Sequence, residues 1–126
     1  MDLEALKWDA NGLIAAIFQD AASGEVLTLA YMDREALRKT LDTGLAHVFR
    51  RSHGKVMMKG EVSGRRQVVK EICTDCDQDA LVIKIEQVGG AACHTGRRTC
   101  FYQRLEGGEW QDICEPLFDP KEVYGK

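Results

Sequence analysis

The amino-acid sequence predicts one α+β domain, built on a mainly antiparallel, meandering and barrel-like β-sheet with a few short helices. Most of its apolar segments are short and bounded by turn residues, as is typical of strands. Only one segment combines a helical pattern with a cap and a stop. A chain of 126 residues buries about two thirds of its unfolded surface, so no metal is needed for cohesion alone. We expect one domain over 1–126, with a core at about 12–106 and a tail at 107–126.

A β-hairpin and a helix are the first expected elements. Apolar runs at 13–19 and 25–32 flank the turn residues of 20–24, which predicts a hairpin. Asp33 is a suitable helix N-cap, and Leu37 and Leu41 are four residues apart on one face of the helix that follows. Gly44 supplies the stop.

Four further strands are expected, at 46–51, 67–72, 81–87 and 101–105. In the third of them, Leu81, Ile83 and Ile85 alternate with the other residues, which is the period of a half-buried strand. Glycines between these segments indicate loops in which the backbone approaches another group closely.

Composition excludes several classes of protein. No apolar run approaches the ~20 residues of a membrane span, so we expect no membrane partner. With 17 basic and 20 acidic residues, a net charge of −3 offers no broad basic surface for nucleic acid. The first residues do not have the pattern of a signal peptide. Five cysteines, an odd number, favour reduced thiols or metal ligands over disulfides, which predicts a cytoplasmic protein.

Two segments, 73–79 and 93–100, concentrate the side chains that bind metals. Zinc prefers thiolate and imidazole, whereas magnesium prefers carboxylate and water. We expect Cys76, Cys93 and Cys100 to bind zinc, and Cys73 to pack in the core. Three protein ligands leave a fourth position open to water, as in catalytic zinc sites. The alternative is a set of buried structural cysteines beside a solvated acidic turn.

The acidic triad Asp75, Asp77 and Asp79 matches the start of a calcium-binding EF-hand loop, but Ala80 occupies the position that requires glycine. The strand pattern that follows also argues against the helix pair of an EF-hand. The triad is therefore expected to share one hard cation such as Mg²⁺ or to form a solvated turn.

Other polar residues suit proton transfer and phosphate binding. His94, next to a proposed ligand, is a candidate general acid or base, with a fourth zinc ligand as the competing role. Seven residues are candidates for substrate binding, because they supply the cations, hydroxyls and flexible backbone that suit a phosphate. These residues are Arg51, Ser52, Lys59, Ser63, Gly64, Arg97 and Arg98.

The segments at 24–37, 75–81 and 93–101 carry a specific resemblance: over about 12–102 the chain resembles the phosphoribosyl-AMP cyclohydrolase family. The resemblance implies hydrolytic opening of the adenine ring of 1-(5-phosphoribosyl)-AMP between N1 and C6, in L-histidine biosynthesis, with zinc activating water. It implies one zinc ion per subunit on Cys76, Cys93 and Cys100, magnesium on the acidic triad, and His94 in catalysis. It also implies a homodimer with shared active sites, in which Cys76 completes the zinc site of the other subunit.

The sequence differs from the family pattern at about 48–58. In this segment the family has a pattern similar to Tyr-Trp-Ser-Arg-Ser-Arg, followed by a tryptophan. A paralogue that hydrolyses a related purine-like ring therefore remains an alternative, as does a zinc-binding module without catalysis. A zinc nucleobase deaminase is disfavoured, because the chain has neither H-x-E nor P-C-x-x-C.

Overall fold

The computed structural model describes residues 3–61, 64–89 and 97–117. The predicted strands and helix are all found, together with a 3₁₀ helix at Leu3–Ala5 and strands at Lys55–Met58 and Glu109–Asp112, which sequence reasoning missed. In chain order the elements are the 3₁₀ helix η1 (Leu3–Ala5), β1 (Ile14–Asp20), β2 (Val26–Met32), α1 (Arg34–Thr43), β3 (His47–Arg50), β4 (Lys55–Met58), β5 (Gln67–Thr74), β6 (Ala80–Gln87), β7 (Gln103–Glu106) and β8 (Glu109–Asp112).

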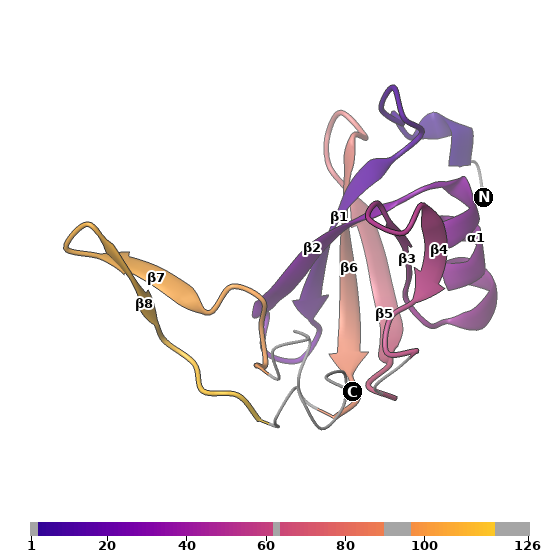
Figure 1. Cartoon of the computed structure of the whole chain (residues 1–126). Coiled ribbons are helices and arrows are strands. Elements are labelled where there is room, and N and C mark those ends of the chain that lie inside the picture. Colours follow the sequence, from indigo (N-terminus) through magenta and orange to yellow (C-terminus); the bar gives the residue numbers. More distant parts are fainter. Residues whose placement is uncertain (1–2, 62–63, 90–96, 118–126) are drawn as a thin grey trace.

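The main sheet has four strands in the order β2-β1-β6-β5 (Figure 1). Its two outer pairs are antiparallel, but the central pair, β1 and β6, is parallel. The α+β class is thus confirmed, whereas the expected antiparallel meander is wrong at the centre of the sheet. The reason is topological: β2, α1, the β3–β4 hairpin and β5 intervene between β1 and β6, so β6 enters beside β1 by a crossover. The described strands form three separate sheets, and none of these closes into a barrel.

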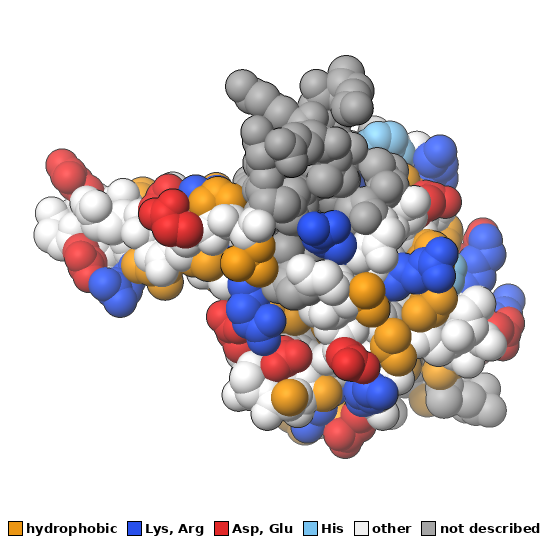
Figure 2. Space-filling view, turned by 90° about the horizontal axis from the view of Figure 1, so that it is seen from below, with side chains coloured by type: hydrophobic (Ala, Val, Ile, Leu, Met, Phe, Trp, Pro, Cys, Tyr) orange, Lys and Arg blue, Asp and Glu red, His pale blue; other side chains and the backbone are white. Residues whose placement is uncertain are grey.

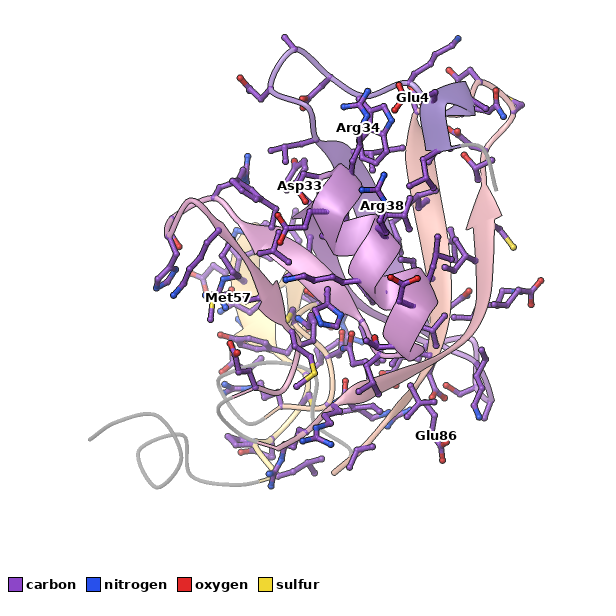
Figure 3. The ribbon with its side chains drawn as sticks, turned by 90° about the vertical axis from the view of Figure 1, so that its right-hand side faces the viewer. Glu4, Asp33, Arg34, Arg38, Met57 and Glu86 are labelled. Carbon is purple, nitrogen blue, oxygen red and sulfur yellow. The ribbon has the colours of Figure 1, made fainter. Side chains whose placement is uncertain are left out.

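Helix α1 follows from local sequence signals. Asp33 is its N-cap, and the Asp33 carboxylate accepts a hydrogen bond of 2.8 Å from the backbone N–H of Ala36. Gly44 ends the helix in the left-handed conformation, with φ 73°. Leu37 is buried as expected, but Leu41 is exposed. The helix lies across one face of the main sheet (Figure 3).

The core lies between the sheet and α1. Alternate residues of β1, including Ile14 and Phe18, face it together with Ile83 and Ile85 of β6, and all four are at most 2% exposed. Each such side chain contributes about 1.5–3 kcal/mol through burial. No described helix is long and apolar enough to cross a membrane.

The opposite face of the main sheet is only partly covered. Ile17 of β1 pairs with Val82 of β6, which pairs in turn with Cys73 of β5, and all three side chains are half-buried. Cys73 therefore lies on this open face and not in the core, where we expected it. Its Sγ lies 3.5 Å from a carboxylate oxygen of Glu71.

The β7–β8 hairpin, residues 103–112, is named here the arm. It projects from the main sheet (Figure 1), and each of its strands pairs only with the other within the described chain. Leu105 pairs with Trp110, and these side chains are 56% and 65% exposed. The arm thus presents a large apolar pair away from the core of its own chain.

Gly60 has a conformation and surroundings that exclude a side chain. Its φ is +85°, and a Cβ atom built on it lies 2.4 Å from the backbone carbonyl of Arg65. We expect Gly60→Ala to lower the free energy of unfolding by about 2 kcal/mol or more, because the cost of the strained backbone and the cost of the clash with Arg65 add together. Urea denaturation measures this change.

Gly54→Ala is a matched control, because Gly54 also has positive φ, +63°, but open space around its Cβ position. The control isolates the conformational cost, about 1–2 kcal/mol. Equal losses in the two variants would show that the contact with Arg65 is unimportant.

Candidate functional site

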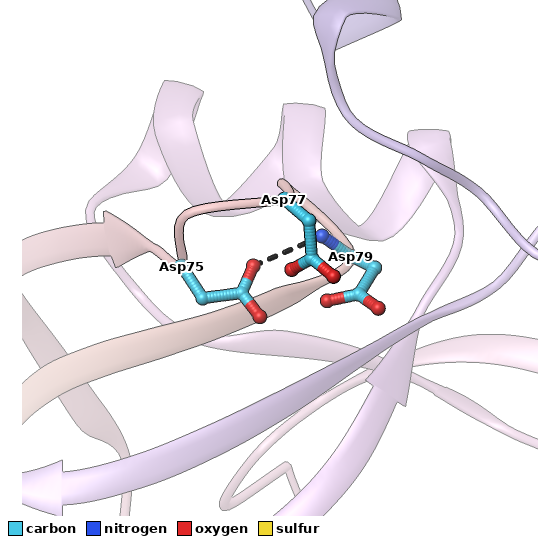
Figure 4. Close-up of side chains that lie close together, drawn as sticks. All are labelled: Asp75, Asp77 and Asp79. Carbon is cyan, nitrogen blue, oxygen red and sulfur yellow. Dashed lines mark hydrogen bonds between the residues drawn. The ribbon is translucent and has the colours of Figure 1, made fainter.

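The turn between β5 and β6 brings three carboxylates together. Oxygens of Asp75, Asp77 and Asp79 all lie within 4.8 Å of one another (Figure 4). The Asp75 carboxylate accepts hydrogen bonds from the backbone N–H groups of Asp79, at 3.0 Å, and Ala80, at 3.3 Å. Gln78 has a φ of 61°, which closes the turn. The predicted acidic triad is therefore a compact, exposed group of oxygen donors.

Proximity of the carboxylates changes the protonation of Asp75 and Asp79. Hydrogen bonding to Asp75, and then to Asp77, raises the pKa of Asp79 to about 6. The hydrogen bond with Asp79 lowers the pKa of Asp75. Asp79 therefore keeps its proton up to about pH 6. Exposed oxygen donors at this spacing fit a hard cation such as Mg²⁺, whose charge compensates the ionised carboxylates at higher pH.

Mg²⁺ should raise the thermal unfolding midpoint more at pH 8 than at pH 5. The pKa of Asp79 in the folded protein is raised above its ordinary value of 3.8. Protonation of Asp79 therefore stabilises the fold fully below pH 3.8, and this contribution is lost as the pH rises through about 6. At pH 8 the cluster is fully charged, so a cation removes the repulsion. At pH 5 the cation competes with a proton.

Thermal unfolding with and without Mg²⁺ at both pH values measures this difference. Asp79→Asn is the control, because it removes the titrating group, and it should reduce the Mg²⁺ effect at pH 8. An Mg²⁺ shift of equal size at pH 5 and pH 8 in the wild-type protein would contradict the prediction.

The two proposed zinc ligands that the structure describes, Cys76 and Cys100, lie at opposite ends of the main sheet. Cys76 is exposed in the acidic turn. Cys100 is half-buried, and its backbone N–H donates a hydrogen bond of 2.6 Å to the carbonyl of Leu27, near the start of β2. Figure 1 shows the β5–β6 turn at the upper end of the sheet and the segment after residue 97 at the lower end. Cys93 and His94 lie outside the described residues.

Strand register gives the scale of this separation. Leu27 lies at a bulge next to Thr28, which pairs with Phe18. Phe18 pairs in turn with Ile83, three residues beyond Ala80 at the acidic turn. This offset is about 10 Å along the strands, and β2 lies two strand spacings, about 10 Å, from β6. Two sulfurs that bind one zinc ion lie about 4 Å apart, since each Zn–S bond is about 2.3 Å. Cys76 and Cys100 of one chain do not meet this requirement.

Arg97 and Arg98, predicted to bind substrate, are held by the protein itself. Arg98 forms ion pairs of 3.2 Å with Asp20 and 2.5 Å with Glu25. Arg97 donates a hydrogen bond of 2.8 Å to the carbonyl of Cys114 and stacks 4.0 Å from the ring centre of Tyr102. Together with the Thr99 hydroxyl, which donates to the Val26 carbonyl, these contacts fix the segment before Cys100 against the β1–β2 hairpin.

The structure brings together only some of the other predicted substrate residues. Arg51 and Ser52 line one cleft beside β2. Lys59 follows β4, at the opposite end of the β3–β4 hairpin, with its Nζ 5.9 Å from the ring centre of Phe18. The backbone N–H of Gly64 donates a hydrogen bond of 2.7 Å to the carbonyl of Gly60. Ser63 lies outside the described residues.

Tyr31 is a further residue of the cleft, and sequence reasoning missed it. The guanidinium of Arg51 lies 4.0 Å from the centre of the Tyr31 ring. The sequence contained one signal, since Tyr31 stands within the resembling segment at 24–37. An apolar-flanked tyrosine in a strand is ordinarily a packing residue, so its role in a cleft was not evident.

Known proteins resemble this chain over most of its length. A family profile described as phosphoribosyl-AMP cyclohydrolase matches residues 28–102. Curated proteins of that name are 53% identical in Chromobacterium violaceum, over 97% of this chain and 92% of the relative, and 58% identical in Syntrophotalea carbinolica, over 92% and 93%. One from Methanococcoides burtonii is 54% identical, over 98% and 99%. With agreement of this extent, the chain belongs to the phosphoribosyl-AMP cyclohydrolase family.

Proposed function

We propose that this protein hydrolyses 1-(5-phosphoribosyl)-AMP, opening its adenine ring between N1 and C6, in histidine biosynthesis. The observation that carries this proposal is the identity of 53–58% with relatives named phosphoribosyl-AMP cyclohydrolase, over nearly the whole chain. We place the reaction in the cytoplasm, which agrees with the odd number of cysteines, since five cysteines favour reduced thiols or metal ligands over disulfides.

Two kinds of metal site fit the side chains of the chain. Asp75, Asp77 and Asp79 would hold Mg²⁺, because their oxygens already converge. Cys76, Cys93 and Cys100 would hold one zinc ion per subunit, which would lower the pKa of water to about 7 for attack on C6.

His94 would move a proton between water and the leaving nitrogen. The contacts of Arg97 and Arg98 anchor the segment that carries Cys100, so these two residues support the site by positioning.

A homodimer with shared active sites explains the separation of Cys76 from Cys100. A second copy supplies the missing ligand to each site if Cys76 of one subunit meets Cys93 and Cys100 of the other. The half-buried open face around Ile17 and Val82, and the exposed Leu105 and Trp110 of the arm, offer apolar surface for such an association. Figure 2 shows hydrophobic side chains along the arm.

Ring opening tests the function directly. The purified protein, loaded with zinc and supplied with Mg²⁺, should change the ultraviolet absorption of phosphoribosyl-AMP as the purine ring opens. Mass spectrometry of the product should show the addition of one water. A zinc-loaded, folded protein that leaves the substrate intact would reject the proposal in favour of a binding module.

A further inference from the structure

The β3–β4 turn carries positive charge that its own neighbourhood does not compensate. Between Asp42 and Glu61 the sequence has four lysines and arginines and no acidic residue, although the whole chain has a net charge of −3. Three of these cations, Arg50, Arg51 and Lys55, lie at the turn, and all three are exposed. The excess charge is therefore local and faces solvent.

Strand register adds a cost to this arrangement. Arg50 and Lys55 are directly opposite one another in the β3–β4 pair, and like charges in that position destabilise a hairpin. Within the described residues no carboxylate forms an ion pair with either of them or with Arg51, whereas Arg98 and Arg104 each have such a partner. An anion bound at this turn would remove the repulsion.

The adjoining cleft has the size and the hydrogen-bond donors for such an anion. Its volume is about 400 Å³, within the range of small-molecule sites. Stacking on Tyr31 orients the Arg51 guanidinium and leaves its N–H edge available for bidentate hydrogen bonds, the geometry that suits phosphate. Apolar and polar side chains both line the cleft: Leu29, Tyr31, Phe49, Arg50, Arg51 and Ser52.

We propose that this cleft binds a phosphate monoester of the nucleotide substrate. The phosphate lies against the N–H edge of Arg51, within the field of Arg50 and Lys55, and the attached sugar or base lies against Leu29 and Phe49. Tyr31 is a positioning residue, since it acts through Arg51. The identity of the ligand rests on the proposed function. The substrate has two such phosphates, one on the adenylate and one on the second ribose, and they share this chemistry.

Calorimetric titration of the full-length protein with AMP, ribose 5-phosphate and adenosine tests the site without turnover. Arg51→Gln should weaken the binding of a phosphate ester about tenfold or more, through loss of charge-assisted hydrogen bonds. Adenosine, which has no phosphate, should be unaffected. Lys39→Gln is the matched control. It also removes one positive charge, but Lys39 lies on α1 and already forms an ion pair with Glu35.

Substitution of Tyr31 tests its positioning role. Tyr31→Phe should retain the affinity for the phosphate ester because the ring remains for stacking, whereas Tyr31→Leu should reduce it. If Arg51→Gln does not fold, Lys55→Gln carries the same test. The ester whose affinity depends on Arg51 identifies which phosphate occupies the cleft.

Two results would overturn this site: a wild-type protein that binds neither ester, or one in which Arg51→Gln and Lys55→Gln leave both affinities unchanged. Failure of the proposed function has a different signature. A protein that binds an ester through Arg51 but does not open the ring supports the cleft and rejects the reaction. Ring opening with a KM that Arg51→Gln does not change supports the reaction and rejects the cleft.

Discussion

Cys100→Ser should abolish the zinc binding that we propose for the wild-type protein, about one ion per chain, and it should reduce ring opening to background. Serine is a much weaker zinc ligand than a thiolate, and loss of one of three protein ligands leaves an incomplete site. The backbone contact between Cys100 and Leu27 does not involve the side chain, so the fold should remain. Elemental analysis of the purified variant measures the zinc content, and circular dichroism confirms folding.

Cys73→Ser and Cys114→Ser are matched controls for the loss of a thiol. Both cysteines are half-buried, and neither belongs to the proposed ligand set. These variants should retain zinc and most activity. His94→Ala should also retain zinc while it loses activity, which separates a proton-transfer group from a ligand. Full zinc retention in Cys100→Ser, or zinc loss in Cys73→Ser, would show that the ligands were chosen wrongly.

Local sequence signals predicted the elements whose structure is decided locally. Helix α1 begins at the Asp33 cap and ends at Gly44, as expected, because capping depends on residues within one turn of the helix. The alternation in β6 likewise gave the correct buried face. Strands β4 and β8 were missed because neither shows the alternation of a half-buried strand: β4 has three apolar residues in a row, and β8 has only one.

Local sequence signals did not predict which distant segments pair in the fold. The parallel contact of β1 with β6 joins segments more than 60 residues apart, and nothing in either segment specifies which partner it takes. Sequence reasoning proposed Arg98 as a substrate-binding residue but did not foresee its ion pairs with Asp20 and Glu25, which lie at the distant β1–β2 turn. Motif spacing identified the acidic triad as a group, since its three members occupy one turn. It gave no information on the distance between Cys76 and Cys100, which depends on the whole sheet.

That distance makes subunit mixing the most informative experiment on the assembly. Cys76→Ala and Cys100→Ala homodimers should each be inactive, because every shared site in them lacks one ligand. In a hybrid dimer, one site contains both substitutions and the other contains neither. Equal amounts of the two variants are unfolded, mixed and refolded with zinc, so that the subunits pair at random.

About half of the resulting dimers should be hybrids with one intact site of two, giving roughly a quarter of wild-type activity. Recovery from background to this level requires that Cys76 of one subunit and Cys100 of the other bind the same zinc ion. Ligands from a single chain would leave every site in the mixture broken, since each chain carries a substitution. Native mass spectrometry counts the hybrid dimers and their zinc ions. Hybrids that form in the expected proportion but remain inactive would exclude the shared site, and the sheet would then have to rearrange to bring Cys76 to Cys100 within one chain.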